Sequence, residues 1–175
     1  MELLEFAPND LGDSLAKRIH ELLNSTWPGD APNEGDYYRT LGAPMTVVIL
    51  HRASDVIAHL AIYERSGGIG SETLEIGMLG GIVVAPEHRQ RGHARVLIRH
   101  AHDRLKGRCI PFSILFAYEP RVYVSSGYKL MQNATRFMDA DGTMKTLIIY
   151  RGSMYAELLG RSWPNQMLDL RARTV

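Results

Sequence analysis

The sequence predicts an α/β fold in which a mixed, largely antiparallel central sheet of about six to seven strands is flanked by about four helices. Three β-rich segments in the first half are joined by short turns, which favours antiparallel neighbours. A strand, a helix and a further strand then follow one another, and this order requires a crossover that makes part of the sheet parallel. The chain of 175 residues fits a single domain, 1–175, with residues 152–175 as a C-terminal tail.

The first half of the chain contains a strand, an amphipathic helix and three further strands. The helix is indicated by apolar residues that recur at helical spacing, with Lys17 and Arg18 facing away from them. Asp10 or Asp13 can cap its first turn. In chain order, the expected elements are a strand at 2–6, this helix at 11–23, a proline and glycine break at 27–36, a short helix or an ordered loop at 34–41, and strands at 45–51, 55–65 and 73–85.

The second half begins with a change of hydrophobic period. From Gly92 to Leu105 the apolar residues share one helical face, and His102 and Asp103 lie off that face. The segment therefore predicts a helix. The remaining expected elements are a strand at 110–117, a short helix within 119–128 that ends at Gly127, and a late strand at 143–150.

Composition argues against several classes of partner. Twenty basic and nineteen acidic side chains leave a net charge of +1, so overall charge favours neither nucleic acid nor an anionic membrane. Glu2 and Glu5 stand where a secretory signal needs basic residues, and no stretch reaches the roughly 20 apolar residues of a membrane span. The single cysteine, Cys109, fits a reducing compartment, so we expect a cytoplasmic protein. The histidines lack a zinc spacing, so no metal is expected.

The junction between the strand at 73–85 and the following helix carries the clearest chemical signal. The first turn of a helix has four N–H groups without intrahelical partners, and together with the helix dipole they favour an anion. Gly92 and the small Ala94 leave space beside those groups, and Arg89 and Arg91 add planar donors. These features point to a pyrophosphate. The alternative is that the glycine only starts the helix and that the arginines are solvated.

The stretch "VVAPEHRQRGHARVL" resembles the acetyl-CoA-binding motif of the GCN5-related N-acetyltransferase (GNAT) superfamily, which implies a GNAT-type fold. The matched positions are Val84, Pro86, Arg89, Gly92, Ala94 and Leu97. The resemblance implies that acetyl-CoA is the cosubstrate and that backbone groups hold the pyrophosphate and pair with the pantetheine arm. The implied coenzyme contacts are Ile82, Val83, Val84, Arg89, Gln90, Arg91, Gly92, His93 and Ala94.

A second stretch, "EPRVYVSSGYKLM", resembles the closing segment of the same superfamily, in which a short helix carries Y-x-x-x-G-F/Y. Tyr123, Gly127 and Tyr128 occupy these places. The resemblance implies that Tyr123 lies near the thioester sulfur and donates a proton to the departing thiolate. A phenol with a pKa near 10 is protonated at neutral pH and can serve as that donor. The alternative is that Tyr123 only packs the short helix.

Scattered matches over most of the chain resemble the aminoglycoside 2'-N-acetyltransferases and, in "SWPNQMLDLRA", the nodulation acyltransferases. This resemblance implies that Asp30, Gly80 and Gly81 border the acceptor pocket, where a carboxylate can pair with an amine. The alternative for Asp30 is an ordinary turn residue. Many members carry a glutamate on the strand before the coenzyme-binding stretch, but here that place has glycines. The general base stays open among Glu75, His59, Glu119 and His88.

The resemblance therefore predicts an acetyl-CoA-dependent N-acetyltransferase that moves an acetyl group to a primary amine of a small molecule in a single step. A domain that senses acyl-CoA or binds a partner without turnover is one alternative, and the missing glutamate favours it. An acyltransferase for longer acyl chains is another. The sequence identifies neither the acceptor nor the oligomeric state, so a homodimer stays open.

Overall fold

The computed structural model describes residues 1–28, 44–139, 141–147 and 152–173, and its contacts divide the chain into two compact units. Unit 1 comprises Met1–Tyr63 and Gly80–Ala101, and unit 2 comprises Glu64–Leu79 and His102–Val175. Two long strands and one helix therefore contribute residues to both units. The assignment of the whole chain to one domain remains a prediction.

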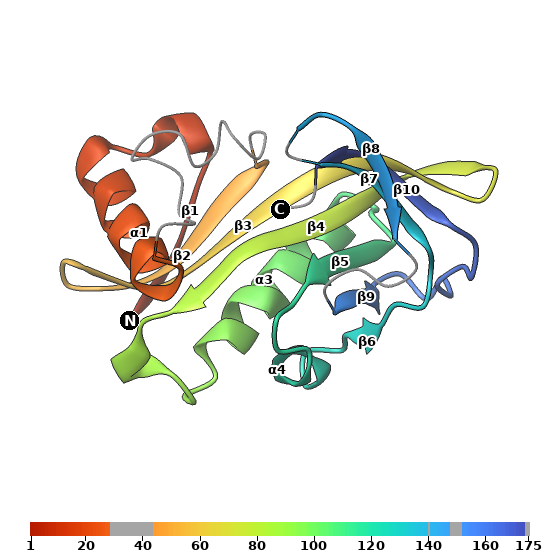
Figure 1. Cartoon of the computed structure of the whole chain (residues 1–175). Coiled ribbons are helices and arrows are strands. Elements are labelled where there is room, and N and C mark those ends of the chain that lie inside the picture. The colour runs from red at the N-terminus through yellow and green to blue at the C-terminus, as the bar shows by residue number, and fades with distance from the viewer. Residues whose placement is uncertain (29–43, 140, 148–151, 174–175) are drawn as a thin grey trace. The chain divides into compact units, whose positions relative to one another are not determined.

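Unit 1 is built from an antiparallel group of strands and two helical segments (Figure 1). Its elements are β1 (Glu2–Phe6), α1 (Asp13–Thr26), β2 (Thr46–Arg52), the first part of β3 (Asp55–Ile69), the last part of β4 (Glu72–Val84) and the first part of α3 (His93–Gly107), with 3-10 turns at Pro8–Asp10 and Pro86–His88. β1 pairs antiparallel with β2, and β2 pairs antiparallel with β3. The pairing shifts where Leu50 opposes Ala58 and His51 opposes Val56, so one residue of β3 is bulged there.

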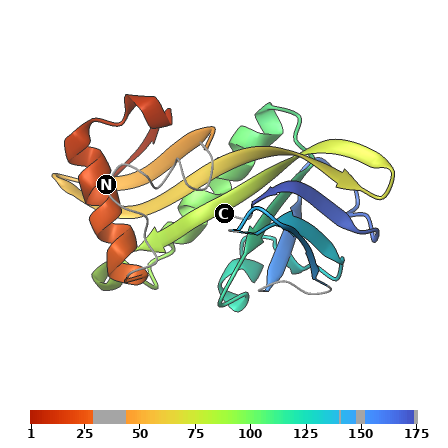
Figure 2. The same cartoon turned by 45° about the horizontal axis from the view of Figure 1, so that its top comes forward.

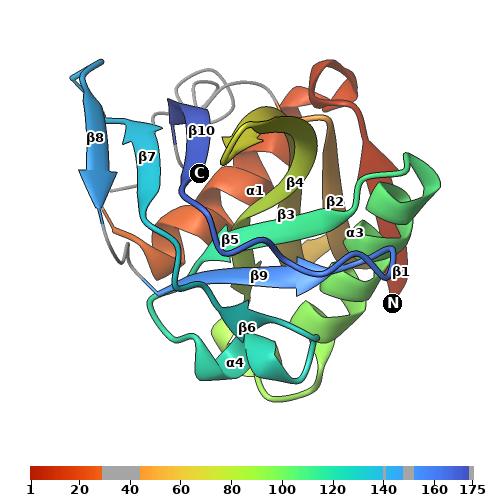
Figure 3. The same ribbon diagram turned by 90° about the vertical axis from the view of Figure 1, so that its right-hand side faces the viewer.

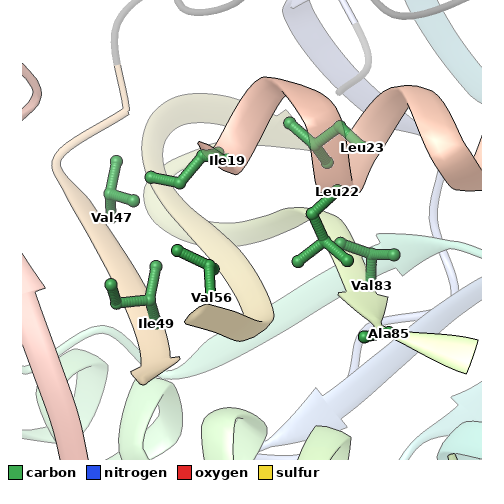
Figure 4. Packing of buried hydrophobic residues seen from close by; sticks show 8 residues of the cluster. All are labelled: Ile19, Leu22, Leu23, Val47, Ile49, Val56, Val83 and Ala85. Carbon is green, nitrogen blue, oxygen red and sulfur yellow. The ribbon is translucent and has the colours of Figure 1, made fainter. Parts of the chain in front are cut away.

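The apolar face of α1 packs on the strands of unit 1, as the helical periodicity predicts. Ile19, Leu22 and Leu23 are buried in one cluster with Val47 and Ile49 of β2. In Figure 4, Ile19 points toward Val47 and Leu22 points toward Val83 of β4. Figure 2 shows α1 lying across these strands. Burying each such side chain stabilises the fold by about 1.5–3 kcal/mol. Because alternate residues of a strand face opposite sides, the equally buried neighbours of Val47 and Ile49 face away from α1.

Unit 2 contains the remaining strands and confirms the mixed sheet. Its further elements are β5 (Phe112–Phe116), α4 (Arg121–Val124), β6 (Lys129–Leu130), β7 (Thr135–Met138), β8 (Met144–Leu147), β9 (Ser153–Glu157) and β10 (Leu168–Arg173). The strand order is β6-β9-β5-β4-β3-β10-β7-β8, and Figure 3 shows β5, β9 and β6 side by side. β4 pairs in parallel with β5, the crossover that the strand–helix–strand order predicts. The described residues form ten strands, more than the six to seven expected.

Two of the additional strands, β9 and β10, lie in the segment predicted as a tail, and Trp163 connects them to the rest of unit 2. Its ring stacks on Tyr155 at 4.8 Å between centroids and meets the edge of Phe112 at 5.0 Å. Its indole N–H donates a hydrogen bond of 2.7 Å to Asn133. Aromatic contact and a satisfied donor together fix the chain between the two strands.

Close packing against α3 explains why position 77, one of the three glycine positions of β4, has no side chain. A Cβ at this position would lie 2.4 Å from Cδ1 and 2.6 Å from Cδ2 of Leu105, a fully buried residue of α3. The absence of a side chain therefore lets the strand and the helix approach closely.

We expect Gly77→Ala to lower the free energy of unfolding by about 1–3 kcal/mol, because the added methyl group overpacks this contact. Urea denaturation measures the change. Gly107→Ala, at the end of the same helix, is the matched control because its Cβ would meet no atom within 4 Å. Equal stability of both variants would contradict the overpacking argument.

Candidate functional site

The junction between β4 and α3 in unit 1 exposes a row of backbone N–H groups. Gln90 and Gly92 have φ values of +60° and +80°, so the chain turns sharply before the helix begins. The N–H of Val96 donates to the Gly92 carbonyl at 3.1 Å, which is the first hydrogen bond of the helix. The N–H groups of residues 90–95 have no backbone acceptor among the described residues. This cradle has the geometry and the dipole that bind phosphate oxygens.

Arginine side chains lie at the same junction. Arg89, Arg91 and Arg95 are exposed, and Nε of Arg89 donates a 3.1 Å hydrogen bond to the Val84 carbonyl. Arg89 therefore ties the loop back to the end of β4. A Cβ on Gly92 would meet nothing within 4 Å, so the space beside the cradle is open among the described residues. An anion there would meet backbone donors first and guanidinium groups at the rim.

His93 opens α3, and its ring lies 6.2 Å from that of His88 at an interplanar angle of 60°. Loss of solvation lowers the pKa of His93, and the neighbouring His88 and Arg91 lower it further. The depressed pKa favours the neutral ring at neutral pH. The backbone groups and arginines, rather than an imidazolium, therefore supply the positive potential of this turn.

The strand that leads into the junction contains a break in its regular conformation. Gly81 has a φ of +58°, which glycine adopts without strain. Gly80 is buried, whereas Ile82 and Val84 keep part of their surface exposed on either side of the buried Val83. The Gly81 carbonyl lies 2.7 Å from Nδ1 of His59 on β3. The glycine pair thus marks an irregular point of the strand with a side-chain partner, a feature that the sequence alone does not distinguish from room for a ligand.

Tyr123 belongs to unit 2, where the short helix α4 positions it. The side chain is half-buried, and burial raises the pKa of its phenol. Its ring meets that of Tyr128 edge to face, with 6.3 Å between centroids. The phenol is therefore protonated at neutral pH and able to donate a proton.

A buried polar network surrounds Tyr128 and was missed by the sequence analysis. The Tyr128 hydroxyl lies 2.6 Å from the Ser113 hydroxyl and 3.1 Å from Nε2 of His102. His102 is only 9% exposed, so its expected place off the apolar face of the helix is wrong. Its burial is possible because the Tyr128 hydroxyl, from a distant segment, satisfies the ring. The only local sign of the burial of His102 is that it lies one helical turn from apolar residues of α3.

The predicted site residues do not all lie in one described unit. The predicted coenzyme contacts from Ile82 to Ala94, together with Gly80 and Gly81, lie in unit 1, and Tyr123 lies in unit 2. Asp30 lies outside the described residues. Of the candidate bases, Glu75 and Glu119 are exposed. His59 is fully buried and burial lowers its pKa to about 4, so it is a poor base at neutral pH.

The described residues contain neither a metal-binding cluster nor a helix suited to cross a membrane. No group of three or more His, Cys, Asp or Glu side chains within 1–28, 44–139, 141–147 and 152–173 could hold a metal ion. Within the same ranges, no helix has the length and apolar character needed to cross a membrane.

Because two histidines are buried, we expect the free energy of unfolding to fall in mild acid. Burial lowers the pKa of both His59 and His102 to about 4, against 6.5 in the unfolded chain. Below pH 6.5 the unfolded chain binds protons that the folded chain does not. Stability is therefore fully present above pH 6.5 and falls toward pH 4, by up to about 1.4 kcal/mol per pH unit for each histidine.

Urea denaturation between pH 7 and pH 4.5 measures this slope, above the range in which most carboxylates titrate. His102→Gln keeps a polar group beside Tyr128 and is expected to make the slope shallower by up to about 1.4 kcal/mol per pH unit. An unchanged slope in this variant would show that His102 is not held neutral by the fold.

Comparisons with known proteins identify the domain. A family model described as "Acetyltransferase (GNAT) domain" matches residues 9–131. No curated protein matches the sequence. The GNAT family N-acetyltransferase YhbS from Escherichia coli, in complex with CoA, aligns with a TM-score of 0.69 and 17% identity over 97% of this chain and 89% of that chain. A GNAT family acetyltransferase from Brucella melitensis, in complex with acetyl-CoA, aligns with a TM-score of 0.63 and 17% identity over 95% and 93% of the two chains.

Other solved structures extend the comparison. An aminoglycoside 6'-N-acetyltransferase complexed with coenzyme A aligns with a TM-score of 0.65 and 15% identity over 93% of this chain and 100% of that chain. Some similar chains are longer. The GCN5-related N-acetyltransferase from Anabaena variabilis aligns with a TM-score of 0.62 and 20% identity over 74% of this chain but only 32% of its own. This chain therefore spans about a third of that protein. At these identities, the structures show a shared fold.

Proposed function

Because this chain belongs to the GNAT acetyltransferase family, we propose that it transfers an acetyl group from acetyl-CoA to a primary amine of a small molecule. The observation that carries the proposal is the cradle of N–H groups at residues 90–95, open beside Gly92 and rimmed by arginines. A pyrophosphate fits these donors. The cradle follows directly on Ile82–Val84, whose partly exposed strand would pair with the amides of pantetheine.

In the proposed reaction, the neutral amine attacks the thioester carbonyl in a single step. A carbon–nitrogen bond forms, the carbon–sulfur bond breaks, and Tyr123 gives its phenolic proton to the departing CoA thiolate. The amine nitrogen loses a proton to solvent, and solvent reprotonates Tyr123. Holding both reactants together supplies much of the rate, since effective molarities reach about 10⁵ M or more. A strand N–H near Val83 would stabilise the oxyanion.

Several features support a small-molecule acceptor. The similarity to an aminoglycoside 6'-N-acetyltransferase fits an amine on a small molecule, as does the sequence resemblance to the 2'-acetylating branch. Gly80 and Gly81 remain our candidates for the acceptor side of the site, together with Asp30. The single cysteine fits a reducing compartment, so we place the proposed activity in the cytoplasm.

Release of free CoA thiol from acetyl-CoA tests the proposed function. The protein is incubated with acetyl-CoA and, in separate reactions, with amino sugars, polyamines, amino acids and peptides with free amino termini. We expect thiol release that depends on one class of amine, and mass spectrometry should show the same amine acetylated. Binding of acetyl-CoA without thiol release for any amine would instead support the sensing or partner-binding alternative. Faster release from a longer acyl-CoA would change the proposed donor.

A further inference from the structure

His59 is a buried residue with a specific partner and no role in the reaction as described above. It lies on β3, opposite Ile49 of β2, and has no exposed surface. Its Nδ1 lies 2.7 Å from the Gly81 carbonyl oxygen, which can only accept a hydrogen bond. Nδ1 must therefore carry the proton, and the ring is the neutral Nδ1–H tautomer. Burial, which lowers its pKa to about 4, keeps the ring neutral at working pH.

The strand is irregular at the Gly81 carbonyl, which has the His59 side chain as a partner. The φ of +58° at Gly81 interrupts the regular conformation of β4. Farther along the strand, the N–H of Ala85 donates to the Ile57 carbonyl of β3 at 2.8 Å, so regular backbone bonding to β3 is present beyond the break. At Gly81 the carbonyl has a side-chain donor from β3, the Nδ1–H of His59. The hydrogen bond satisfies this part-buried carbonyl and holds its direction.

Holding this carbonyl also fixes the direction of a neighbouring donor. The Gly81–Ile82 peptide is trans, as are all peptide bonds in the described residues. In a trans peptide the C=O and the N–H point in opposite directions. Because the Gly81 carbonyl points to His59, the N–H of Ile82 points to the edge of β4 that faces away from β3. The bond from Ala85 to Ile57 agrees, since alternate residues of a strand direct their backbone groups to alternate edges.

We infer that His59 is a positioning residue that, through its bond to the Gly81 carbonyl, aims the Ile82 N–H at the acyl-pantetheine end of the coenzyme. This inference rests on the proposed function, in which the edge of Ile82–Val84 receives the pantetheine arm. His59 touches no substrate and exchanges no proton. It fixes a backbone donor that stabilises charge on the thioester oxygen, so its loss affects turnover more than coenzyme binding.

Three substitutions at this position separate positioning from general-base catalysis. His59→Asn places an amide N–H near the site of Nδ1, so kcat is expected to stay within about 3-fold of the wild-type value. His59→Leu removes the donor, and kcat is expected to fall at least about 10-fold with a smaller change in KM for acetyl-CoA. His59→Gln places its amide near Nε2 instead and should behave like His59→Leu. A general base would be lost equally in all three variants.

A matched control separates positioning from loss of packing. Val56→Ala removes a buried side chain from the same strand without touching the hydrogen bond, so it is expected to lower stability while kcat stays unchanged. If Val56→Ala lowers kcat as much as His59→Leu at equal folded fraction, the inference is overturned.

A measurement on the wild-type protein covers the case in which the leucine variant does not fold. Nitrogen-15 NMR of the histidine side chains distinguishes the tautomers, and His59 is expected to be Nδ1–H and unchanged between pH 6 and pH 8. An Nε2–H tautomer would overturn the inference. If the wild-type protein releases no thiol with any amine, the proposed function fails, whereas normal turnover in His59→Leu would refute this inference alone.

Discussion

Replacing Tyr123 by phenylalanine is expected to lower kcat for acetyl transfer by about 10²-fold or more, because the CoA thiolate loses its proton donor. The phenol is half-buried and its pKa is raised, so the proton is present throughout the neutral range. Steady-state kinetics with acetyl-CoA and an accepted amine measure the change. KM for acetyl-CoA should change little, since in the proposed site most coenzyme contacts come from residues 82–94 and the phenol contributes mainly at the departing sulfur.

Tyr118→Phe provides the control for this experiment. Tyr118 lies just before the same short helix and is 72% exposed, so removal of its hydroxyl should leave kcat unchanged. Because the pKa of Tyr123 is raised, wild-type kcat should not decline through ionisation of this residue between pH 7 and pH 9. Wild-type turnover in Tyr123→Phe would mean that the tyrosine only packs α4.

Replacing Gly92 by valine is expected to weaken coenzyme A binding at least about 10-fold. Gly92 has a φ of +80°, a conformation that a β-branched residue adopts at a cost of about 1–3 kcal/mol. The new side chain would also occupy the open space beside the N–H groups. Arg91→Ala should weaken binding less, by about 5-fold or less, because an exposed charge contributes little. Isothermal titration calorimetry with coenzyme A gives both values.

Gly142→Val is the matched control for the backbone strain that valine causes at a positive φ. Gly142 has a φ of +83° and a Cβ there would meet nothing within 4 Å, so the backbone cost is similar. It lies in unit 2, outside the proposed site, and its replacement should leave coenzyme affinity unchanged. A larger effect from Arg91→Ala than from Gly92→Val would show that side-chain charge, not the backbone cradle, holds the coenzyme.

Local patterns were sufficient for the part of the fold that carries the proposed site. The strand ending at Val84, the glycine at position 92 and the apolar period of α3 lie within one continuous stretch, so short-range rules predict them. The strands β9 and β10 depend instead on distant partners. Trp163 between them is held by Tyr155, Phe112 and Asn133, and no local pattern encodes that combination.

The glycines of β4 show why residue type alone does not define a role. Gly77 is required by the close approach of Leu105, and Gly81 by its positive φ. The sequence assigned only Gly80 and Gly81 to the acceptor pocket and gave no separate role to Gly77. His102 is similar, because its burial depends on hydroxyl groups that other segments bring to it. Such roles follow from tertiary contacts and become visible only in the folded chain.

Amide NMR tests directly whether the junction after β4 binds the coenzyme through backbone N–H groups. Coenzyme A is titrated into nitrogen-15-labelled protein, and pantetheine, which lacks the pyrophosphate, is titrated separately. We predict the largest amide shifts at residues 90–94 with coenzyme A, and shifts at residues 82–84 but not at 90–94 with pantetheine. Binding of coenzyme A that leaves the amides of residues 90–94 unshifted would show that these N–H groups do not hold the coenzyme.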